Sequence, residues 1–384
     1  MKFNKIFIAL IPSLVLCSIS SCSTNNSTDI KTNSNIIISE YFCGEVYYDS
    51  AIELSNISSE DISLSGYKLN IFSKGEIKTT IELNETIKAN SCFVYANKGF
   101  SNSTNLVDIK VLDDNILTGK NHIELVDSKS NLLDCIGLKD YDISYANNES
   151  LVRLKEYYNG YKEYNYLQYV RVKANLKTYL GNQNVPLTVD ELMDGPKLTS
   201  VYSNLDFTNS TESALGGYVN VSIVSLGDGD TTVFKYDSKS NLNELTQRTR
   251  YLMINTPEVD HGPESTIVEE KWGKTAEIYN NDRLNKAKHI IVQSNKGYGL
   301  RETYGRLLGY VWYTDKENPT LSDYKLLNHE MVVQGLARFD SRDKYETMYT
   351  DDVLYYEYFM YAYEYASQNQ IKLYGNDDDP NFNK

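Results

Sequence analysis

Short apolar stretches separated by polar turn residues dominate the first part of the chain. Apolar residues concentrate over 36–42, 51–56 and 122–126, and Ser, Asn, Gly and Asp cluster between these runs. Runs of this length bounded by turn residues are typical of β-strands, and many of them in succession predict an all-β sandwich. We therefore expect a β-sandwich domain over 35–155, followed by an extension and linker over 156–214.

The pattern changes from about Gly216, where helical spacing appears between strand-like runs. Strand-like runs lie at 218–226, 231–236, 248–254, 288–293 and 305–313. Helical stretches are expected at 272–286, 323–334 and 352–368, with a shorter one at 188–193. Strands interspersed with such helices fit an OB-type barrel. We expect an OB-fold barrel with three helices over 215–375 and a polar tail over 376–384.

The N-terminus has the pattern of an export signal. Lysines precede an apolar run over 6–17 that is too short to span a bilayer as a helix, and a Ser-rich stretch then ends at Cys22. The string ISSC at 19–22 resembles a bacterial lipobox, in which the cysteine is acylated and becomes the mature N-terminus. The alternative is an ordinary signal that is cleaved nearby, with Cys22 incidental.

The lipobox resemblance implies a place in the cell. We expect a lipoprotein signal peptide over 1–22 and a flexible polar tether over 23–34. A lipid on Cys22 would then anchor the protein to the cell membrane, facing outward.

Composition narrows the functional classes. The chain has 384 residues, a hydrophobic content of 41% and a formal net charge of −14. These values exclude a disordered chain, a collagen and a multi-pass membrane protein. The acidity argues against a charge-driven nucleic-acid coat, because such binding depends on many Lys/Arg–phosphate contacts. An enzyme that touches a few phosphates remains compatible with it.

The cysteines give no metal motif. If Cys17 and Cys22 belong to the leader, Cys43, Cys92 and Cys135 remain, and their spacing matches no ligand pattern. Because the count is odd, at least one of them is unpaired. We expect buried free thiols.

Candidate chemistry lies in three strings. The string DGDT at 228–231 places two carboxylates around a glycine, which suits a hard cation such as calcium but also occurs in ordinary hairpin turns. The string RYLMINTPE at 250–258 opens with an arginine and ends in a polar turn. The string YGRLLGYV at 304–311 again places an arginine at the start of an apolar strand. Each string taken singly is also compatible with a purely structural role.

Together these strings resemble a known family. With NHEMVVQGLA at 328–337 they follow, in order and spacing, the motifs of the thermonuclease family, the staphylococcal-nuclease-like phosphodiesterases. The resemblance runs from the DGDT string to 374–375. It implies an OB-fold nuclease that hydrolyses DNA or RNA and uses Ca²⁺ as its cofactor.

The resemblance implies individual roles around the metal. Asp230 matches the family's calcium carboxylate, and Thr256 supplies a backbone carbonyl to the ion. Asn255 stands where the family has its second metal-binding aspartate, so this chain departs from the pattern there. Glu258 matches the residue assigned as general base, which takes a proton from the attacking water.

The resemblance also implies the phosphate-binding residues. Arg250 and Arg306 match the two arginines that grip the scissile phosphate, and Tyr304 occupies the spacing of a tyrosine near the substrate. Two guanidinium groups can bind phosphate oxygens bidentately and neutralise the charge that develops during hydrolysis. These roles are consistent with phosphodiester chemistry.

The first domain resembles a second family, the lamin tail domain, which has an immunoglobulin-like fold. The motifs that carry this resemblance are ISE at 38–40, IELSN at 52–56, LSGYKL at 64–69 and SLVR at 150–153. The resemblance implies an immunoglobulin-like β-sandwich in which Glu53 and Asn56 are structural. His122 has no partner motif, so we expect a surface or capped histidine and no ligand role.

The expected fold is therefore mainly β with some α, an N-terminal immunoglobulin-like β-sandwich followed by a C-terminal OB-fold barrel. The expected function is that of a surface-anchored, calcium-dependent nuclease acting on DNA and/or RNA. Two alternatives stay open: a catalytically weak binding module with the thermonuclease fold, and an envelope adhesin that uses the lamin-tail-like domain to bind a ligand of its own. The joint presence of Asp230, Arg250, Glu258 and Arg306 favours the enzyme.

Overall fold

The described part of the chain is mainly β with four α-helices. The computed structural model describes residues 30–101, 106–140, 144–173, 179–182, 187–208, 216–260, 262, 269–295, 300–339 and 354–375. Cys22, the expected signal peptide and the expected polar tail lie outside these residues. Within them, no helix has the length and apolar character needed to cross a membrane.

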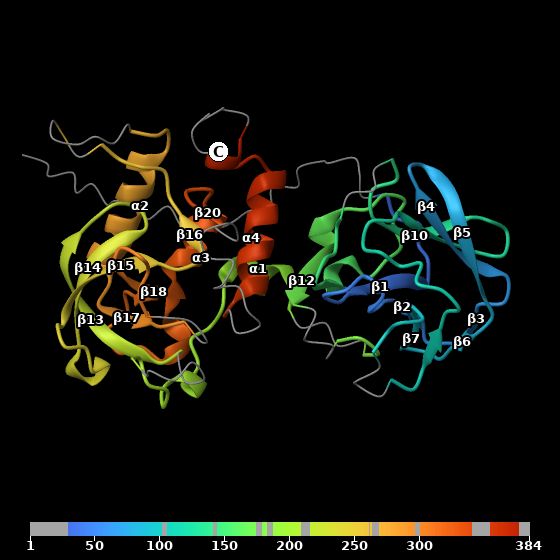
Figure 1. Cartoon of the computed structure of the whole chain (residues 1–384), viewed down its shortest axis with the longest axis horizontal. Coiled ribbons are helices and arrows are strands. Elements are labelled where there is room, and N and C mark those ends of the chain that lie inside the picture. The colour runs from blue at the N-terminus through green and yellow to red at the C-terminus, as the bar shows by residue number, and fades with distance from the viewer. Residues whose placement is uncertain are drawn as a thin grey trace, which may run out of the picture.

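Two sheets make up the N-terminal half (Figure 1). The first contains β1 (Ile36–Cys43), β2 (Ser50–Asn56), β7 (Ser91–Ala96), β8 (Ile109–Val111), β11 (Glu149–Arg153) and β12 (Tyr169–Lys173), in the order β12-β11-β1-β2-β7-β8. The second contains β4 (Tyr67–Ser73), β5 (Glu76–Leu83), β9 (Ile123–Val126) and β10 (Leu132–Ile136), in the order β10-β9-β4-β5. A short ribbon pairs β3 (Ile62–Ser63) with β6 (Thr86–Ile87).

One hydrophobic core joins these two sheets. Ile38 and Leu54 from the first sheet, and Leu69 and Leu125 from the second, are fully buried in the same cluster. Burial of apolar area on facing sheets is the main stabilising term in such an arrangement. A two-layer β arrangement is therefore present, while its immunoglobulin-like and lamin-tail character stays a prediction.

Several polar residues singled out in the sequence have internal partners here. Asn56 is fully buried, and its amide donates to the carbonyls of Glu60 and Ile87 at 2.7 and 3.0 Å. The ring of His122 is 6% exposed, with Nδ1 2.8 Å from the Gly137 carbonyl, so this histidine is capped as expected. The expectation of buried free thiols is confirmed for Cys43, Cys92 and Cys135.

The C-terminal half is a closed β-barrel that fits an OB-fold. Its strands are β13 (Tyr218–Leu226), β14 (Thr231–Tyr236), β15 (Thr246–Tyr251), β17 (His289–Gln293), β18 (Leu307–Thr314) and the short β19 (Lys325–Leu326). They run in the order β15-β14-β13-β17-β18-β19, and a parallel pairing of β15 with β18 closes the barrel. A ribbon of β16 (Ile254–Asn255) and β20 (Arg338–Phe339) lies beside it.

Two expected elements are interrupted in the structure. The strand expected over 248–254 ends at Tyr251, because Met253 adopts a left-handed backbone with φ of 67°. The helix expected over 323–334 is shorter and becomes α3 (Leu327–Val333), because Leu326 instead pairs with Trp312 of β18 as part of β19. The sequence prediction was wrong in both details.

The remaining helices lie close to their expected places. They are α1 (Val189–Asp194), α2 (Gly273–Lys286) and α4 (Tyr356–Gln368). A capping box starts α1, with Thr188 accepting from the Glu191 amide. α2 begins one residue later than expected, since Trp272 has a left-handed φ of 72°.

Helix α4 connects the two halves (Figure 1). Phe359 belongs to the barrel core, whereas Tyr361 packs with Val170 of the first sheet. Arg171 on β12 donates to Glu364 on α4 at 2.5 Å. The tyrosine-rich stripe of this helix therefore packs against protein on both sides.

Candidate active site

The closure of the barrel brings the two arginine strings together. β15 and β18 pair in parallel, with Arg250 opposite Leu308. Arg306 directly precedes Leu307, which pairs with Thr249, so both arginines lie where the two strands meet. This region is called the barrel mouth below, and Asp230 and Asn255 contact Arg250 there.

Asn328 holds β18 and the residue that follows β15 together from inside the barrel. This fully buried side chain on α3 accepts from the Val311 amide at 2.8 Å and donates to the Leu252 carbonyl at 2.9 Å and the Gly309 carbonyl at 3.3 Å. A Cβ at Gly309 would lie only 2.5 Å from Val292, so the close approach requires glycine. The Asn and Gly of these motifs therefore have structural roles.

The turn before β14 supplies the central carboxylate. Asp230 is 1% exposed, and its Oδ2 accepts from the Thr256 amide at 2.7 Å. Its Oδ1 accepts from Nη1 of Arg250. A Cβ at Gly229 would lie 2.7 Å from Thr256 and 2.9 Å from Ala276, which explains why glycine stands at this turn. Asp230 thus holds the turn against the next segment of the site.

Arg250 bridges Asp230 to Asn255. Its Nη2 donates to the amide oxygen of Asn255 and, at 3.3 Å, to the Ile254 carbonyl. The side chains of Asp230, Arg250 and Asn255 and the backbone of Thr256 therefore form one hydrogen-bonded group. The metal and phosphate roles expected for these residues stay predictions.

The backbone of Glu258 is fixed by the start of α2. Its amide donates to the Glu270 carboxylate at 3.0 Å, and the Glu270 amide donates back to the Glu258 carbonyl at 3.0 Å. A Cβ at Gly273 would lie 2.3 Å from that carbonyl, so only glycine allows the helix to begin there. These contacts involve only the backbone of Glu258, and its side chain is exposed.

The charges around Glu258 connect it to the rest of the site. Partial burial raises the pKa of Glu258 above its ordinary value, and the Asp230 carboxylate adds to the increase. Arg250 and Arg306 act in the opposite direction. Because all three groups influence Glu258, the carboxylate lies within the combined field of the arginines and Asp230.

Asp228 is a further carboxylate that no individual assignment covered. Its Oδ1 is buried and has no hydrogen-bond partner among the described residues. Burial and the neighbouring Asp230 raise the pKa of Asp228 to about 6. The DGDT string gave the signal, since it places two carboxylates two positions apart, but the family resemblance assigned only Asp230.

Arg306 also has an internal carboxylate partner, Glu302, which sequence reasoning missed. Arg306 donates from Nε at 2.6 Å and from Nη2 at 3.2 Å to the two oxygens of Glu302. The Glu302 side chain is only 4% exposed, and its pKa is lowered by this pairing. The i, i+4 spacing of the two opposite charges was the available signal.

Tyr304 lies at the rim and not within the hydrogen-bonded group. Its side chain is 82% exposed. It lines a shallow open pocket together with Gln247, Arg248, Gly305 and Arg306. The structure therefore places Tyr304 beside Arg306 but does not bring it into contact with Asp230 or Asn255.

The comparison with known families covers most of this site. Residues 248–372 match the family model of the staphylococcal nuclease homologue. The chain therefore carries a staphylococcal-nuclease-like domain. The matched segment includes Arg250, Glu258 and Arg306, whereas Asp228 and Asp230 precede it. No curated protein matches the chain.

The oxygen groups at the barrel mouth fit a hard cation. Among the described residues, no three His, Cys, Asp or Glu side chains come close enough to form a metal cluster. The donors at the mouth are mixed instead: the carboxylates of Asp228 and Asp230, the Asn255 amide and the Thr256 carbonyl. Calcium accepts all three kinds of oxygen, and the unpartnered buried oxygen of Asp228 is a free donor for it.

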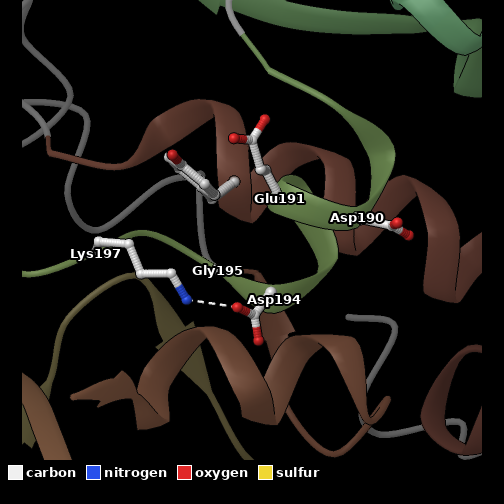
Figure 2. Close-up of a pocket in the computed structure, with 6 residues that line it drawn as sticks. Asp190, Glu191, Asp194, Gly195 and Lys197 are labelled. Atoms are coloured by element: carbon white, nitrogen blue, oxygen red, sulfur yellow. Dashed lines mark hydrogen bonds and ion pairs between the residues drawn. The ribbon is translucent and has the colours of Figure 1, made fainter. Parts of the chain in front are cut away.

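A second polar pocket lies outside the nuclease-like barrel, between α1 and α4 (Figure 2). Its lining includes Glu191, Asp194 and Lys197. Asp194 pairs with Lys197, and Glu191 accepts from the Thr188 amide at 2.8 Å. These two carboxylates serve local structure, so the pocket does not compete with the barrel mouth as a catalytic site.

Proposed function

We propose that this protein is a surface-anchored, calcium-dependent nuclease that hydrolyses phosphodiester bonds of DNA and/or RNA. The nuclease-like domain supports the reaction class. The observation that carries the proposal is the grouping of Arg250, Asp230 and Glu258 at the mouth of the barrel, with Arg306 directly before the neighbouring strand β18. This grouping combines cationic and carboxylate side chains as phosphodiester hydrolysis requires.

In this proposal, Arg250 and Arg306 bind the scissile phosphate. Each guanidinium already faces a carboxylate, Asp230 or Glu302, that keeps it oriented. A phosphate oxygen can use the remaining donors of each fork, and two forks can neutralise the charge that grows during attack. The paired carboxylates therefore act as positioning groups for the arginines.

Glu258 is the proposed general base. Its raised pKa brings the carboxylate closer to the operating pH, which improves proton transfer from the attacking water. The arginines beside it keep the ionised form accessible. General-base catalysis of this kind contributes about 10²–10⁴-fold to the rate.

The proposed cofactor is Ca²⁺, held by Asp230, Asn255 and the Thr256 carbonyl, with Asp228 as an additional oxygen donor. Bound there, the ion supplies polarisation of the phosphoryl oxygen. A neutral amide at Asn255 adds no charge to the donor set, so the carboxylates carry the electrostatic attraction.

The proposal includes the export signal and the first domain. Acylation of Cys22 would hold the protein on the outer face of the membrane, and the lamin-tail-like domain would add a ligand of its own. Cys22→Ser should release the protein from the membrane fraction or block its maturation. Unchanged partitioning into detergent after this change would refute the anchor.

A nuclease assay of the soluble chain tests the central claim. The chain without its leader should degrade DNA or RNA in a zymogram with calcium and fail to do so in excess chelator. Absence of hydrolysis on both nucleic acids in calcium would overturn the proposal.

Asn255 favours a second candidate, a binding module with weak or no catalysis. An amide in place of a carboxylate reduces the charge available to a divalent ion. Tight nucleic-acid binding without hydrolysis at saturating calcium would support this candidate over the enzyme.

A further inference from the structure

β15 places a second arginine on the same exposed face as Arg250. Successive side chains of a strand point to opposite faces, so Arg248 and Arg250 share a face at a spacing of ~6.6 Å. The burial pattern agrees, since Arg248 is exposed and Arg250 half-buried while the alternate residues of the strand are buried. Two guanidinium groups therefore follow one another along the strand that leads into the site.

Arg248 differs from the other arginines at the mouth in its partners. Arg250 is bonded to Asp230, and Arg306 to Glu302. Within the part of the chain that the structure describes, the Arg248 side chain has no hydrogen bond, ion pair or ring contact. Its five N–H donors therefore remain available to a ligand from outside.

Arg248 also lines the shallow pocket that Tyr304 borders. Tyr304 is held on a tight turn, in which the Gly305 amide donates to the Glu302 carbonyl at 2.9 Å. Arg301 fastens the same turn by donating to the Gly305 carbonyl at 2.7 Å. An exposed aromatic ring on a fixed turn, next to a guanidinium that has no partner among the described residues, offers a stacking surface and a charge in one pocket.

We propose that this pocket binds the nucleotide adjacent to the scissile bond, with Arg248 as a positioning residue that binds the neighbouring phosphate. The inference rests on the proposed nuclease function. The strand spacing of Arg248 and Arg250 is similar to that of successive phosphates in an extended single strand. Because the Tyr304 ring can stack only on an unpaired base, the substrate segment in the pocket is single-stranded.

The test compares a substrate that has a neighbouring phosphate with one that has none. Oligothymidylate has the neighbour, whereas bis(p-nitrophenyl) phosphate contains a single phosphodiester. In Arg248→Gln, the ratio of kcat/KM on oligothymidylate to kcat/KM on the small diester should fall about tenfold. The slope of log kcat/KM against log salt on oligothymidylate should become shallower by about one.

Matched variants separate charge from position. Lys239 is an exposed cation in the 3-10 turn η4 (Ser238–Ser240), beyond the end of β14 that lies away from Asp230. Lys239→Gln removes the same charge and should keep the wild-type ratio. Arg248→Lys keeps the charge and should recover part of the ratio. A tenfold loss in Lys239→Gln as well would overturn the positioning role.

Two outcomes distinguish this inference from the proposed function. Hydrolysis by the wild type with an unchanged ratio in Arg248→Gln would refute the Arg248 pocket and leave the nuclease intact. If the wild type hydrolyses neither of these substrates nor RNA, the nuclease is refuted, and the pocket is tested by binding of fluorescent oligothymidylate. An equal Kd for wild type and Arg248→Gln would then refute the pocket too, whereas about tenfold weaker binding would support it.

Discussion

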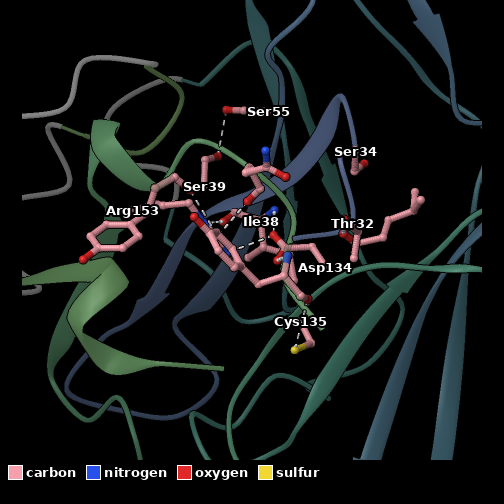
Figure 3. A network of polar contacts seen from close by, with 12 residues as sticks. Thr32, Ser34, Ile38, Ser39, Ser55, Asp134, Cys135 and Arg153 are labelled. Carbon is pink, nitrogen blue, oxygen red and sulfur yellow. Dashed lines mark hydrogen bonds and ion pairs between the residues drawn. The ribbon is translucent and has the colours of Figure 1, made fainter. Parts of the chain in front are cut away.

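Two aspartate–arginine pairs, one in each half of the molecule, have opposite surroundings. Asp134 and Arg153 join the strands of the N-terminal half and are both 0% exposed (Figure 3). Asp230 and Arg250 lie at the barrel mouth, where the arginine side chain is 12% exposed. The same two residue types thus form a closed pair in one place and an accessible pair in the other.

The closed pair is saturated by internal hydrogen bonds. Asp134 accepts from Arg153 and the Ile38 amide at 2.8 Å each and from the Tyr161 amide at 3.0 Å. Arg153 further donates to the Ile38 carbonyl at 2.8 Å and the Asn159 carbonyl at 2.9 Å. Burial of a charge is tolerated only with such partners, so this pair serves the fold.

Not all polar groups around the Asp230–Arg250 pair have a hydrogen-bond partner among the described residues. Beside Asp230, the buried Oδ1 of Asp228 has no partner among the described residues. Glu258 lies exposed nearby with a raised pKa. Carboxylate oxygens without a partner cost stability, and a bound cation would satisfy them, whereas a phosphate would pair with the accessible arginine. The contrast separates a structural ion pair from a candidate active site without reference to any family.

The largest effect that we expect is a loss of catalytic turnover when Glu258 at the barrel mouth is changed. Glu258→Gln should lower kcat about 10²–10⁴-fold, because the proton acceptor is lost while the shape of the side chain is kept. Substrate binding and thermal stability should stay near wild type. The control is Glu269→Gln, which removes the same charge from an exposed neighbour and should retain activity. Similar turnover in the two variants would remove Glu258 from its proposed role.

The second effect concerns stability of the closed pair. Asp134→Asn should lower the free energy of unfolding by about 3–5 kcal/mol, because it leaves the Arg153 charge buried without its counter-ion. Urea unfolding of both proteins measures the difference. A loss below about 1 kcal/mol would show that the buried pair does not stabilise the N-terminal half.

The sequence predicted the elements of the fold best where a single strand-like pattern is bounded by turn residues. The strands at 218–226 and 231–236 were predicted to the residue, because each is bounded by turn residues and pairs with a sequence neighbour. The break at Met253 escaped prediction, since a left-handed backbone at a methionine has no local signature. The contact of Arg171 with Glu364 also escaped, because 193 positions separate the two residues.

Sequence motifs identified only some of the residues that lie at the candidate site. Those motifs named Asp230, Arg250, Glu258 and Arg306, and the parallel pairing of β15 with β18 explains why the segments of the two arginines lie together. The motifs did not reveal that Glu302 orients Arg306 or that Oδ1 of Asp228 has no hydrogen-bond partner among the described residues. Such facts depend on which atoms face one another, and sequence spacing leaves that undetermined.

The third prediction is a gain in stability, opposite to the loss expected for Asp134→Asn. Asp228→Asn should raise the free energy of unfolding at pH 7 by about 1–2 kcal/mol, because it removes a buried carboxylate beside Asp230. The folded pKa of about 6 is above the ordinary aspartate value, so the unfolded state loses this proton first, and stability falls as the pH rises from about 4 to about 6. The gain should therefore be fully present above about pH 6 and disappear by about pH 3, where Asp228 is protonated in both states. Urea unfolding of both proteins at about pH 3 and pH 7 without calcium checks it, and a loss of stability at pH 7 would contradict it.

The smallest effect that we predict is at Asn255, which accepts a hydrogen bond from Arg250 beside the accessible pair. The Asn255 amide oxygen already accepts from Arg250, and an aspartate oxygen can occupy the same place. The added negative charge should strengthen attraction for a divalent ion, because affinity in such sites rises with ligand charge. Asn255→Asp should lower the half-saturating calcium concentration about threefold to tenfold and change saturated turnover much less. Calcium titrations of activity on both forms measure this, and an equal half-saturation point would show that this side chain does not set the metal affinity.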